Sequence, residues 1–343
     1  MKKGIAIAGN LIVDHVKMID SYPAMGMLTN IREVSDSIGG CAGNTICDLA
    51  IIDRSVPLKC IGRIGADADG NYILKMLESC GIDTSLIKKT SATTTSFTDV
   101  MTSLSQNERT FFHARGANAE FCIDDIPFDQ INADIFHLGY ALLLDKFDIS
   151  DPDSEFGTVF ARALAYAQKA GMKTSMDVVS ENSDRFDILV PPCLKYCDYL
   201  IINEIEAAQT TGISIRGADR KIIDSEVKRV IEKMFSLGVS DTVCVHAPEG
   251  GWYSKKGGTV FYRDSLYLPK GYIKGKVGAG DAFCAGMLYS LYREFNPDYS
   301  LRVANAAAGA NLSQKNSIDG MRDFTEMMKL DALYADVKPD EYC

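Results

Sequence analysis

The chain has 343 residues, of which 46% are hydrophobic and 24% charged, and its formal net charge is −10. This composition is typical of a soluble globular protein, and the length predicts one large domain plus a small appendage, because single cores stop growing at about 250 to 300 residues. The acidic balance argues against a nucleic-acid partner, and no stretch approaches the roughly 18 unbroken apolar residues of a membrane helix.

Short apolar runs alternate with amphipathic stretches along the chain. Runs typical of buried strands occur at residues 4–9, 58–62, 134–138, 173–178, 198–202 and 242–246. Helix-like stretches lie between several of these runs, at residues 43–53, 69–80, 156–170, 204–211 and 220–237. Strands that alternate with helices predict an α/β fold with a doubly wound, mostly parallel sheet flanked by helices.

Two segments interrupt this alternation, at residues 17–36 and 93–115. Both have the pattern of antiparallel strands rather than of buried parallel ones. We expect them to pair as a small antiparallel β lid over the edge of the main domain. This division assigns residues 1–16, 37–92 and 116–330 to the core and residues 331–343 to a C-terminal extension that frays.

Ten cysteines are scattered along the chain, mostly inside apolar segments and without the paired spacing of metal sites. They predict reduced core thiols in a cytoplasmic protein. Cys193 and Cys197 come close together, but no second cysteine pair or histidine cluster completes a zinc site with them. The apolar run at residues 4–9 is too short for a signal peptide, although two lysines precede it.

The most informative stretch is residues 275–286, GKVGAGDAFCAG. Gly278 and Gly280 let the backbone approach a ligand, and the residues that follow favour a helix, whose first amides bind anions. An acidic residue at this place is often only a helix cap. If these amides and that of Ala279 hold a phosphoryl group, however, Asp281 is placed to take a proton from an attacking hydroxyl.

Residues 278–281 and the Ala282-Phe283 pair after them resemble the C-terminal signature of the ribokinase-like (PfkB) carbohydrate kinases. The resemblance covers essentially residues 4–325. It implies ATP-dependent phosphorylation of a hydroxyl on a sugar or sugar-like molecule. In this family the Gly-Ala-Gly amides form the anion hole, and the aspartate, here Asp281, is the catalytic base.

A second glycine motif, Gly39-Gly40-Cys41-Ala42-Gly43-Asn44, lies between the first lid segment and a predicted helix. Taken alone, a glycine pair before a helix permits a turn as readily as a ligand contact. The motif resembles the family's glycine pair and the asparagine that bonds sugar hydroxyls. Asp14 matches an early acidic residue that grips two hydroxyls. The resemblance thus implies substrate contacts for Asp14, Gly39, Gly40 and Asn44.

In the second lid segment, residues 108–113 resemble a lid strand of many sugar kinases. Arg109 and His113 are therefore candidates to cover the substrate. The alternative is that they are solvated or paired side chains, as is usual on half-exposed strands. Exposed strand edges seek partners, so the lids of two subunits are also candidates to pair into a homodimer.

Asn203-Glu204-Ile205-Glu206 directly follows the strand predicted at residues 198–202. The spacing places Asn203 and Glu206 one helical turn apart at the carboxyl end of a strand, where open sheets bind ligands. An N-cap with a capping-box partner explains the same residues locally. The pair resembles the family's Asn-x-x-Glu motif, which implies that it holds the water shell of Mg²⁺.

The same resemblance implies contacts with ATP elsewhere in the last third of the chain. His246 and Gly251 lie near the family's phosphate-contacting turn, although Ala247-Pro248 replaces its first glycine. The helix and loop that flank the adenine match more loosely, around Asn305 and Asn311.

A departure from the family concerns a monovalent cation. Many relatives carry an aspartate six residues before the catalytic one, where it helps to bind such a cation, and Gly275 stands there in this chain. Lys274 and Lys276 flank it. Either an ammonium group supplies the missing positive charge, or both lysines point to solvent.

Three functions remain open on the sequence: a sugar kinase, a nucleoside kinase of the same fold, and a regulatory protein that binds sugar or nucleotide without catalysis. A fold does not separate them. The intact Asp281 favours an enzyme.

Overall fold

The structure, a computed structural model, describes residues 2–106, 108–181 and 183–337. A nine-stranded sheet runs through its centre in the order β15-β14-β13-β12-β11-β8-β1-β4-β5. Neighbours from β13 to β5 are parallel, and the β13–β14 and β14–β15 pairs are antiparallel. The strands are β1 (Ile5–Gly9), β4 (Leu58–Gly65), β5 (Asp83–Thr90), β8 (Ile135–Ala141), β11 (Lys173–Val178), β12 (Tyr199–Asn203), β13 (Thr242–Ala247), β14 (Gly250–Lys255) and β15 (Val260–Asp264).

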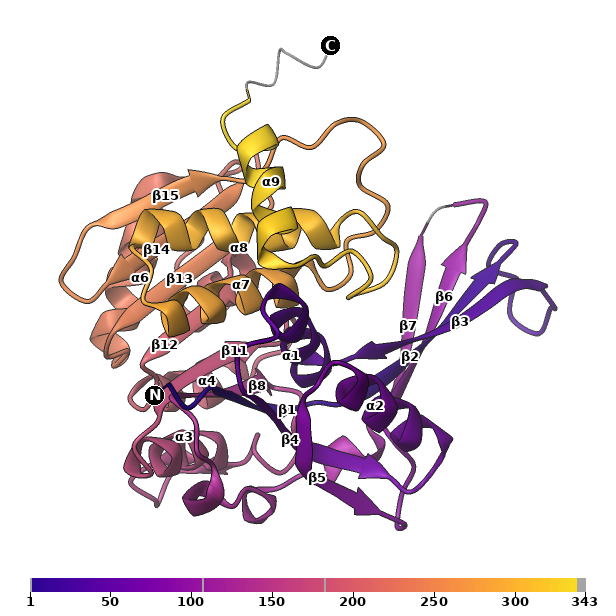
Figure 1. The fold of residues 1–343 in the computed structure, drawn as a ribbon, viewed down its shortest axis with the longest axis horizontal. Helices are drawn as coiled ribbons and strands as arrows, with labels where there is room; N and C mark the ends of the chain where they lie inside the picture. The colour runs from indigo at the N-terminus through magenta and orange to yellow at the C-terminus, as the bar shows by residue number, and fades with distance from the viewer. Residues whose placement is uncertain (1, 107, 182, 338–343) are drawn as a thin grey trace.

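Helices cover both faces of this sheet, as Figure 1 shows. One face packs against α1, α2, α7, α8 and α9, and the other against α3, α4, α5 and α6. The helices are α1 (Cys41–Ile52), α2 (Ala68–Ser79), α3 (Val159–Lys169), α4 (Phe186–Leu194), α5 (Glu204–Thr211), α6 (Asp224–Leu237), α7 (Ala279–Arg293), α8 (Pro297–Asn311) and α9 (Phe324–Tyr334).

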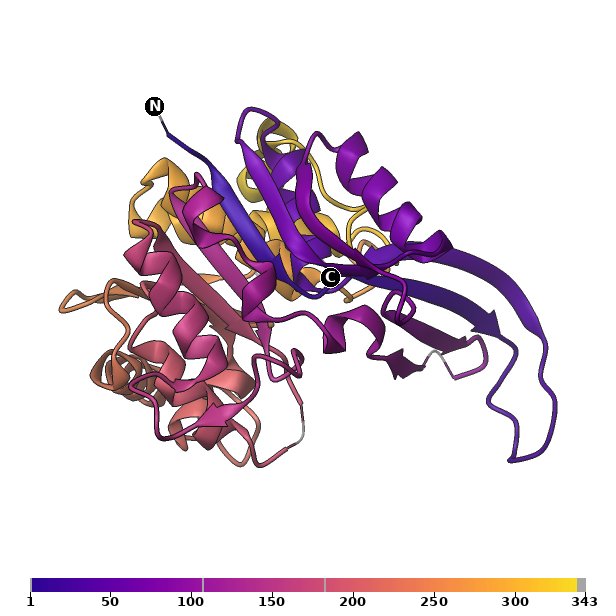
Figure 2. The same ribbon diagram turned by 90° about the horizontal axis from the view of Figure 1, so that it is seen from below.

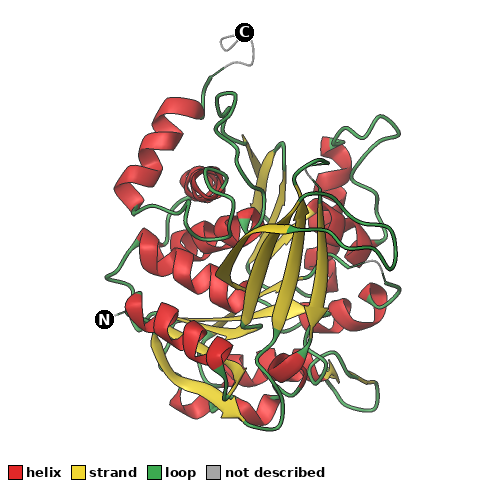
Figure 3. Ribbon diagram, turned by 90° about the vertical axis from the view of Figure 1, so that its right-hand side faces the viewer, coloured by secondary structure: helices red, strands yellow, loops and turns green. Residues whose placement is uncertain are grey.

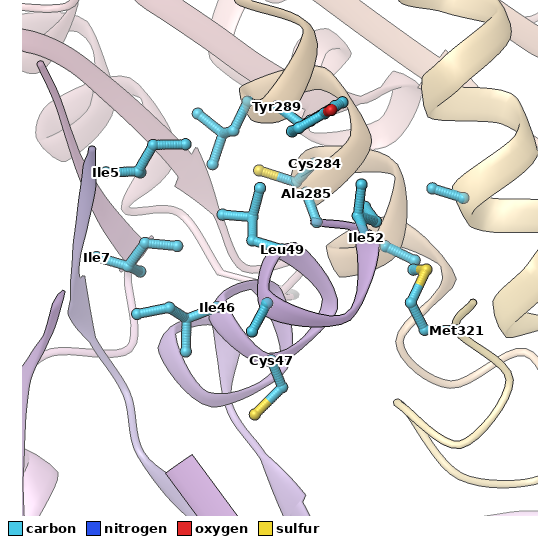
Figure 4. Close-up of a cluster of buried hydrophobic side chains, with 14 of the residues drawn as sticks. Ile5, Ile7, Ile46, Cys47, Leu49, Ile52, Cys284, Ala285, Tyr289 and Met321 are labelled. Carbon is cyan, nitrogen blue, oxygen red and sulfur yellow. The ribbon is translucent and has the colours of Figure 1, made fainter. Parts of the chain in front are cut away.

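The two hydrophobic cores meet at β1, because successive side chains of a strand point to opposite faces. Ile5 and Ile7 belong to the core around α1 and α7, whereas Ala6 and Ala8 belong to the core around α3 and α6. Figure 4 shows the first of these cores, with side chains of α1 close to those of α7. This packing holds the first turns of α1 and α7 at one edge of the sheet.

A second sheet of four strands, in the order β3-β2-β6-β7, projects from the core (Figures 1 and 2). We call this sheet the lid. Figure 3 shows the molecule with the lid facing the viewer. Its outer pairs are antiparallel, but the central pair, β2 with β6, is parallel. Both central strands leave the main sheet in the same direction, after the parallel strands β1 and β5. The lid strands are β2 (Ile12–Ile19), β3 (Ile31–Gly39), β6 (Phe97–Ser103) and β7 (Arg109–Ala114).

The expected fold class, a mostly parallel sheet flanked by helices with a small antiparallel β lid, is confirmed, except that the central pair of the lid, β2 with β6, is parallel. Each apolar run predicted as a strand lies in the main sheet, and the helix-like stretches correspond to α1, α2, α3, α5 and α6. A two-stranded sheet also occurs, formed by β9 (Ser150–Asp151) and β10 (Gly157–Thr158).

The C-terminal extension expected at residues 331–343 needs a correction. Residues 331–334 complete α9, and Asp331 is buried against the guanidinium of Arg302. The ion pair between Asp331 and Arg302 connects the last turns of α9 to α8. Residues 338–343, including Cys343, lie outside the described part of the chain.

The nine cysteines that the structure describes are free thiols, and most of them are buried, as expected. Cys193 and Cys197 are fully buried in the core around α3 and α4. Within the described ranges, no helix combines the length and the apolar character needed to cross a membrane.

Candidate active site

Residues 275–278 form the loop before α7. The loop lies at the edge of the main sheet where its parallel strands end. Gly278 is the N-cap of α7 and has φ +78°, a left-handed conformation that favours glycine. A Cβ at Gly278 would lie 2.6 Å from the Cβ of Ser317 and 2.7 Å from its carbonyl oxygen. At Gly280 the nearest side-chain atom, Cε1 of His246, is 3.5 Å away from such a Cβ. Gly278 thus permits the turn before α7, and Gly280 leaves space beside His246.

Asp281 lies in the first turn of α7 and is buried, with 7% of its surface exposed. The hydroxyl of Tyr140 donates to Oδ1, and the side-chain amide of Asn44 donates to Oδ2 over 2.8 Å. Burial raises the pKa of Asp281 to about 6, and the two hydrogen bonds oppose that rise. At neutral pH the carboxylate is therefore ionised, yet it is more basic than an exposed aspartate.

A cavity of about 280 Å³ opens beside Asp281. It brings together residues from the ends of β8, β11, β12 and β13 and from the start of α7. Five predicted site residues besides Asp281 line it: Gly278, Gly280, Asn203, Glu206 and His246. We call it the inner cavity.

Asn203 and Glu206 form the local cap and also face the inner cavity. Asn203 accepts hydrogen bonds from the amides of Ile205 and Glu206, and Glu206 Oε2 accepts one from the amide of Asn203. Glu206 Oε1 accepts from Ser180 Oγ over 2.7 Å. Burial raises the pKa of Glu206 to about 8. The structure thus shows the helix cap, and it places the same two residues at the wall of the inner cavity.

A second cavity, of about 640 Å³, lies under the lid. Asp14 and Arg109 line it, together with Phe111 of the lid and residues 314–317 of the core. Burial raises the pKa of Asp14 to about 6. We call this the lid cavity. Val277 lines the lid cavity and Gly278 lines the inner cavity, so the two cavities lie on either side of the same loop.

The glycine pair before α1 makes room for two groups of this site. A Cβ at Gly39 would lie 2.6 Å from Oδ2 of Asp14, and a Cβ at Gly40 would lie 2.4 Å from the carbonyl oxygen of Asn10. Asn44, on the first turns of α1, reaches Asp281 and keeps its own buried Oδ1 without a partner among the described residues. Asn44 therefore has a free acceptor beside the candidate base.

The remaining lid candidate, His113, does not line either cavity in the described part of the chain. It is exposed on β7, where its Nδ1 lies 3.0 Å from Oγ1 of Thr98. The solvated or paired alternative thus describes His113 in this structure.

Three residues expected near the nucleotide line neither cavity among the described residues, and each makes a contact within the fold. Gly251 is buried in β14, where a Cβ would lie 3.0 Å from both Phe283 and Leu301. Asn305 donates to the carbonyl oxygen of Asp264 over 2.9 Å, and Asn311 donates to that of Ser317. The spacing of Asn305 and Asn311 in the sequence does not reveal that their side-chain amides donate to backbone carbonyl oxygens.

His246 does face the inner cavity. Its ring stacks on Phe283 at 4.7 Å between ring centroids. Loss of water lowers the pKa of His246 to about 4, so the imidazole is neutral at pH 7 and offers one donor and one acceptor.

The position that carries an aspartate in many relatives is closed here. A Cβ at Gly275 would lie 2.6 Å from the carbonyl oxygen of Gln314. Lys274 and Lys276 are both exposed, and Lys274 lines the lid cavity. Both lysines therefore point to solvent, and Lys274 also faces the lid cavity.

Sequence reasoning missed Tyr140 and Ser180. Tyr140 lies near the end of β8, just after the apolar run at residues 134–138, and Ser180 follows β11; both are at the carboxyl edge of the sheet. Polar residues just after predicted parallel strands were the available signal. Their partners, Asp281 and Glu206, are far away in the sequence.

The contact between Tyr140 and Asp281 predicts a pH effect. We expect kcat/KM to rise with pH to half its maximum near pH 6, as Asp281 ionises in the free enzyme. Tyr140→Phe removes a bond that favours the ionised form, so this midpoint should move up by about 1 pH unit.

The control is Tyr289→Phe, because the Tyr289 hydroxyl donates to Asp53, outside both cavities. Profiles of kcat/KM against pH decide the matter. An acid midpoint that does not move in Tyr140→Phe means that Asp281 is not the group that titrates.

The chain matches the model of the pfkB family carbohydrate kinase over residues 2–323. It is 23% identical over 336 residues to a ribokinase of Arabidopsis thaliana, across 95% of this chain and 80% of that one. A 5-dehydro-2-deoxygluconokinase of Geobacillus thermodenitrificans is 23% identical over 292 residues, across 83% and 81%. A nucleoside kinase of Methanothermobacter thermautotrophicus is 23% identical over 336 residues, across 95% of each chain.

The structure is also similar to solved ones. The structure of Arabidopsis thaliana ribokinase in complex with ribose and ATP superposes with a TM-score of 0.77 and 22% identity, and the match covers 96% of this chain and 99% of that one. At that identity the likeness bears on the fold, and it confirms the ribokinase-like architecture.

Proposed function

Because the chain belongs to the pfkB family of carbohydrate kinases, we propose that it transfers the terminal phosphoryl group of ATP to a hydroxyl of a sugar or sugar-like molecule, with Asp281 as the base. One observation carries this proposal. The inner cavity and the lid cavity lie on either side of residues 277–278, and the buried carboxylate of Asp281 lines the inner cavity beside this loop.

The substrate hydroxyl approaches from the lid cavity. Asp14 accepts hydrogen bonds from sugar hydroxyls, and the free Oδ1 of Asn44 accepts another close to Asp281. Arg109 closes the cavity from the lid. Asp281 then takes the proton of the attacking hydroxyl, which a carboxylate with a pKa of about 6 does at neutral pH.

The phosphoryl group of ATP lies in the inner cavity. The first backbone amides of α7, at residues 278–280, have no partners within the helix and point toward the place where negative charge develops. The positive end of the helix adds to this stabilisation. Neutral His246 and Gly280 line the same cavity, and we place the nucleotide phosphates beside them.

The donors at the inner cavity fit Mg²⁺ held through water. The described oxygens of Glu206 are occupied by Ser180 and Asn203, so direct ligation would break these bonds. A hydrated ion leaves them intact, and Mg²⁺ keeps several waters. When bound, the ion neutralises charge on the phosphates. Asn203 and Glu206 would hold its water shell.

Glu206→Gln tests this assignment. We expect the Mg²⁺ concentration for half-maximal activity to rise about tenfold, as for loss of an outer-shell partner, with the sugar KM nearly unchanged. Since Glu206 has a pKa of about 8, Mg²⁺ competes with a proton, and the requirement of the unmodified protein should fall between pH 6 and pH 8.

The matched control is Glu204→Gln, because Glu204 pairs with Arg216 at 2.8 Å and does not line the inner cavity. Activity is titrated with Mg²⁺ at fixed ATP. Equal Mg²⁺ curves for Glu206→Gln and the unmodified protein contradict the site.

A nucleoside is the second candidate substrate. The lid cavity of about 640 Å³ has room for more than a pentose, and the aromatic ring of Phe111 borders it. ATP consumption measured over a panel of furanoses, hexoses, sugar acids and nucleosides separates the candidates. A regulatory protein without catalysis would consume ATP with none of them.

We also propose a cytoplasmic protein that dimerises through the lid. Its reduced cysteines suit a reducing compartment. Outer strands β3 and β7 expose apolar side chains at Val34, Phe111 and Phe112. We expect the unmodified protein to sediment as a dimer and the Phe112→Asp variant to dissociate into monomers at higher protein concentrations. A monomer at every protein concentration contradicts this assembly.

A further inference from the structure

Three buried side chains gather under the inner cavity without a role in phosphoryl transfer. They are Cys41, the first residue of α1, His137 of β8 and Asp177 of β11. One ligand atom from each lies within 4.8 Å of the other two. We propose that these three residues bind a divalent cation of the Zn²⁺ class, at a site separate from that of the nucleotide's Mg²⁺.

Two of the three side chains have polar atoms without partners. His137 is fully buried and Asp177 is 6% exposed, yet Nε2 of His137 and Oδ1 of Asp177 make no hydrogen bond to the described residues. Buried polar atoms nearly always have a partner, since an unmade bond costs about 1 to 3 kcal/mol. A bound cation would satisfy both atoms at once.

The spacing of the ligand atoms suits a tetrahedral ion. Nε2 of His137 lies 3.6 Å from Oδ2 of Asp177, which is too long for a good hydrogen bond. Zinc bonds of about 2.0 to 2.2 Å place nitrogen and oxygen ligands about 3.4 Å apart at a tetrahedral angle. The nitrogen and oxygen ligands are therefore already close to this spacing, and the Cys41 sulfur, within 4.8 Å of both, would move closer as the ion binds.

Neighbouring residues prepare the ligands. Nδ1 of His137 lies 3.0 Å from Oγ of Ser175, a partner that orients the ring with Nε2 toward the other two ligands. Gly139 supplies the space: a Cβ there would lie 2.0 Å from Oδ1 of Asp177 and 2.5 Å from Sγ of Cys41. Any larger residue would fill the site.

The ligand set also decides which ion binds. A thiolate and an imidazole favour Zn²⁺ or Co²⁺, whereas Mg²⁺ prefers oxygen ligands such as those around Glu206. On binding, the Cys41 thiol releases its proton and forms the metal–sulfur bond. The thiolate and the Asp177 carboxylate then balance the charge of the ion. Asp177 also lines the inner cavity, which provides the path of entry and an open fourth position.

Cobalt absorption tests the proposal without nucleotide or sugar, so the outcome does not depend on kinase activity. The protein is stripped of metal by a chelator and titrated with Co²⁺. We expect one equivalent to bind with a thiolate-to-cobalt charge-transfer band. Cys41→Ser should lose the band. Cys284→Ser should keep it, because Cys284 lines the same cavity but is not a ligand.

A second measurement covers variants that fold poorly. Zn²⁺ should raise the melting temperature of the unmodified protein and of Cys284→Ser, but not of Cys41→Ser or His137→Gln. Excess Mg²⁺ should not displace the cobalt band. The proposal is overturned if the unmodified protein gives no band, if Cys41→Ser keeps it, or if Mg²⁺ removes it.

Discussion

Asp281→Asn should lower turnover by about 10²- to 10⁴-fold, the contribution of a positioned general base. The fold should survive, because the new amide oxygen still accepts from Asn44 and its NH₂ group donates to the hydroxyl of Tyr140, which accepts as well as donates. Nucleotide binding should persist. The measurements are kcat and the affinity for ATP.

A matched control is available one turn further along the neighbouring helix. Asp48 of α1 is a fully buried aspartate whose pKa is held above the usual range by burial, as for Asp281, but it lines neither cavity among the described residues. Asp48→Asn should therefore leave turnover unchanged. Near-normal turnover in Asp281→Asn would remove Asp281 from the mechanism.

The two glycines of the anion-binding loop should respond to alanine in different ways. Gly278→Ala puts a side chain at φ +78° and against the backbone of Ser317, which should cost about 1 to 3 kcal/mol of stability. Displacement of the amides should also lower kcat by about 10²- to 10³-fold.

Gly280→Ala should instead keep or slightly increase stability, because alanine favours the first turn of α7 and meets no atom closer than 3.5 Å. Its methyl group points into the inner cavity, so we expect kcat/KM for ATP to fall by about 10²-fold. Thermal melts and kinetics of both variants are compared. Full activity of Gly280→Ala would exclude phosphate from the inner cavity.

Much of the fold follows from local pattern. Strands β1, β12 and β13 are largely buried on both faces and therefore appear as apolar runs. Edge strand β5 was not predicted, because most of its side chains are at least partly exposed and its sequence, DTSLIKKT, is polar. Helix α4 contains Pro191 and Pro192, which argue against a helix on sequence grounds.

The candidate site shows the same division between local and distant information. Asp281 and the glycines before it form one contiguous motif, so the sequence predicts their arrangement. The Tyr140 contact joins residues 141 positions apart and depends on the packing of α7 over the sheet. Gly251 packs against Phe283 and Leu301, and Asn305 donates to the carbonyl oxygen of Asp264, 41 positions away; local spacing does not reveal such contacts.

The interior place of β1, between β8 and β4, has a consequence for biosynthesis. Its partner β4 is translated soon after it, but its other partner, β8, begins at Ile135. The side chains of β1 that pack in the core with α7 are not covered by that helix until it is synthesised, and it begins at Ala279. Non-local pairing of this kind slows folding. The emerging chain therefore holds an apolar strand without its full cover until α7 has been synthesised, and we expect its aggregation during synthesis to depend on how long β1 stays exposed.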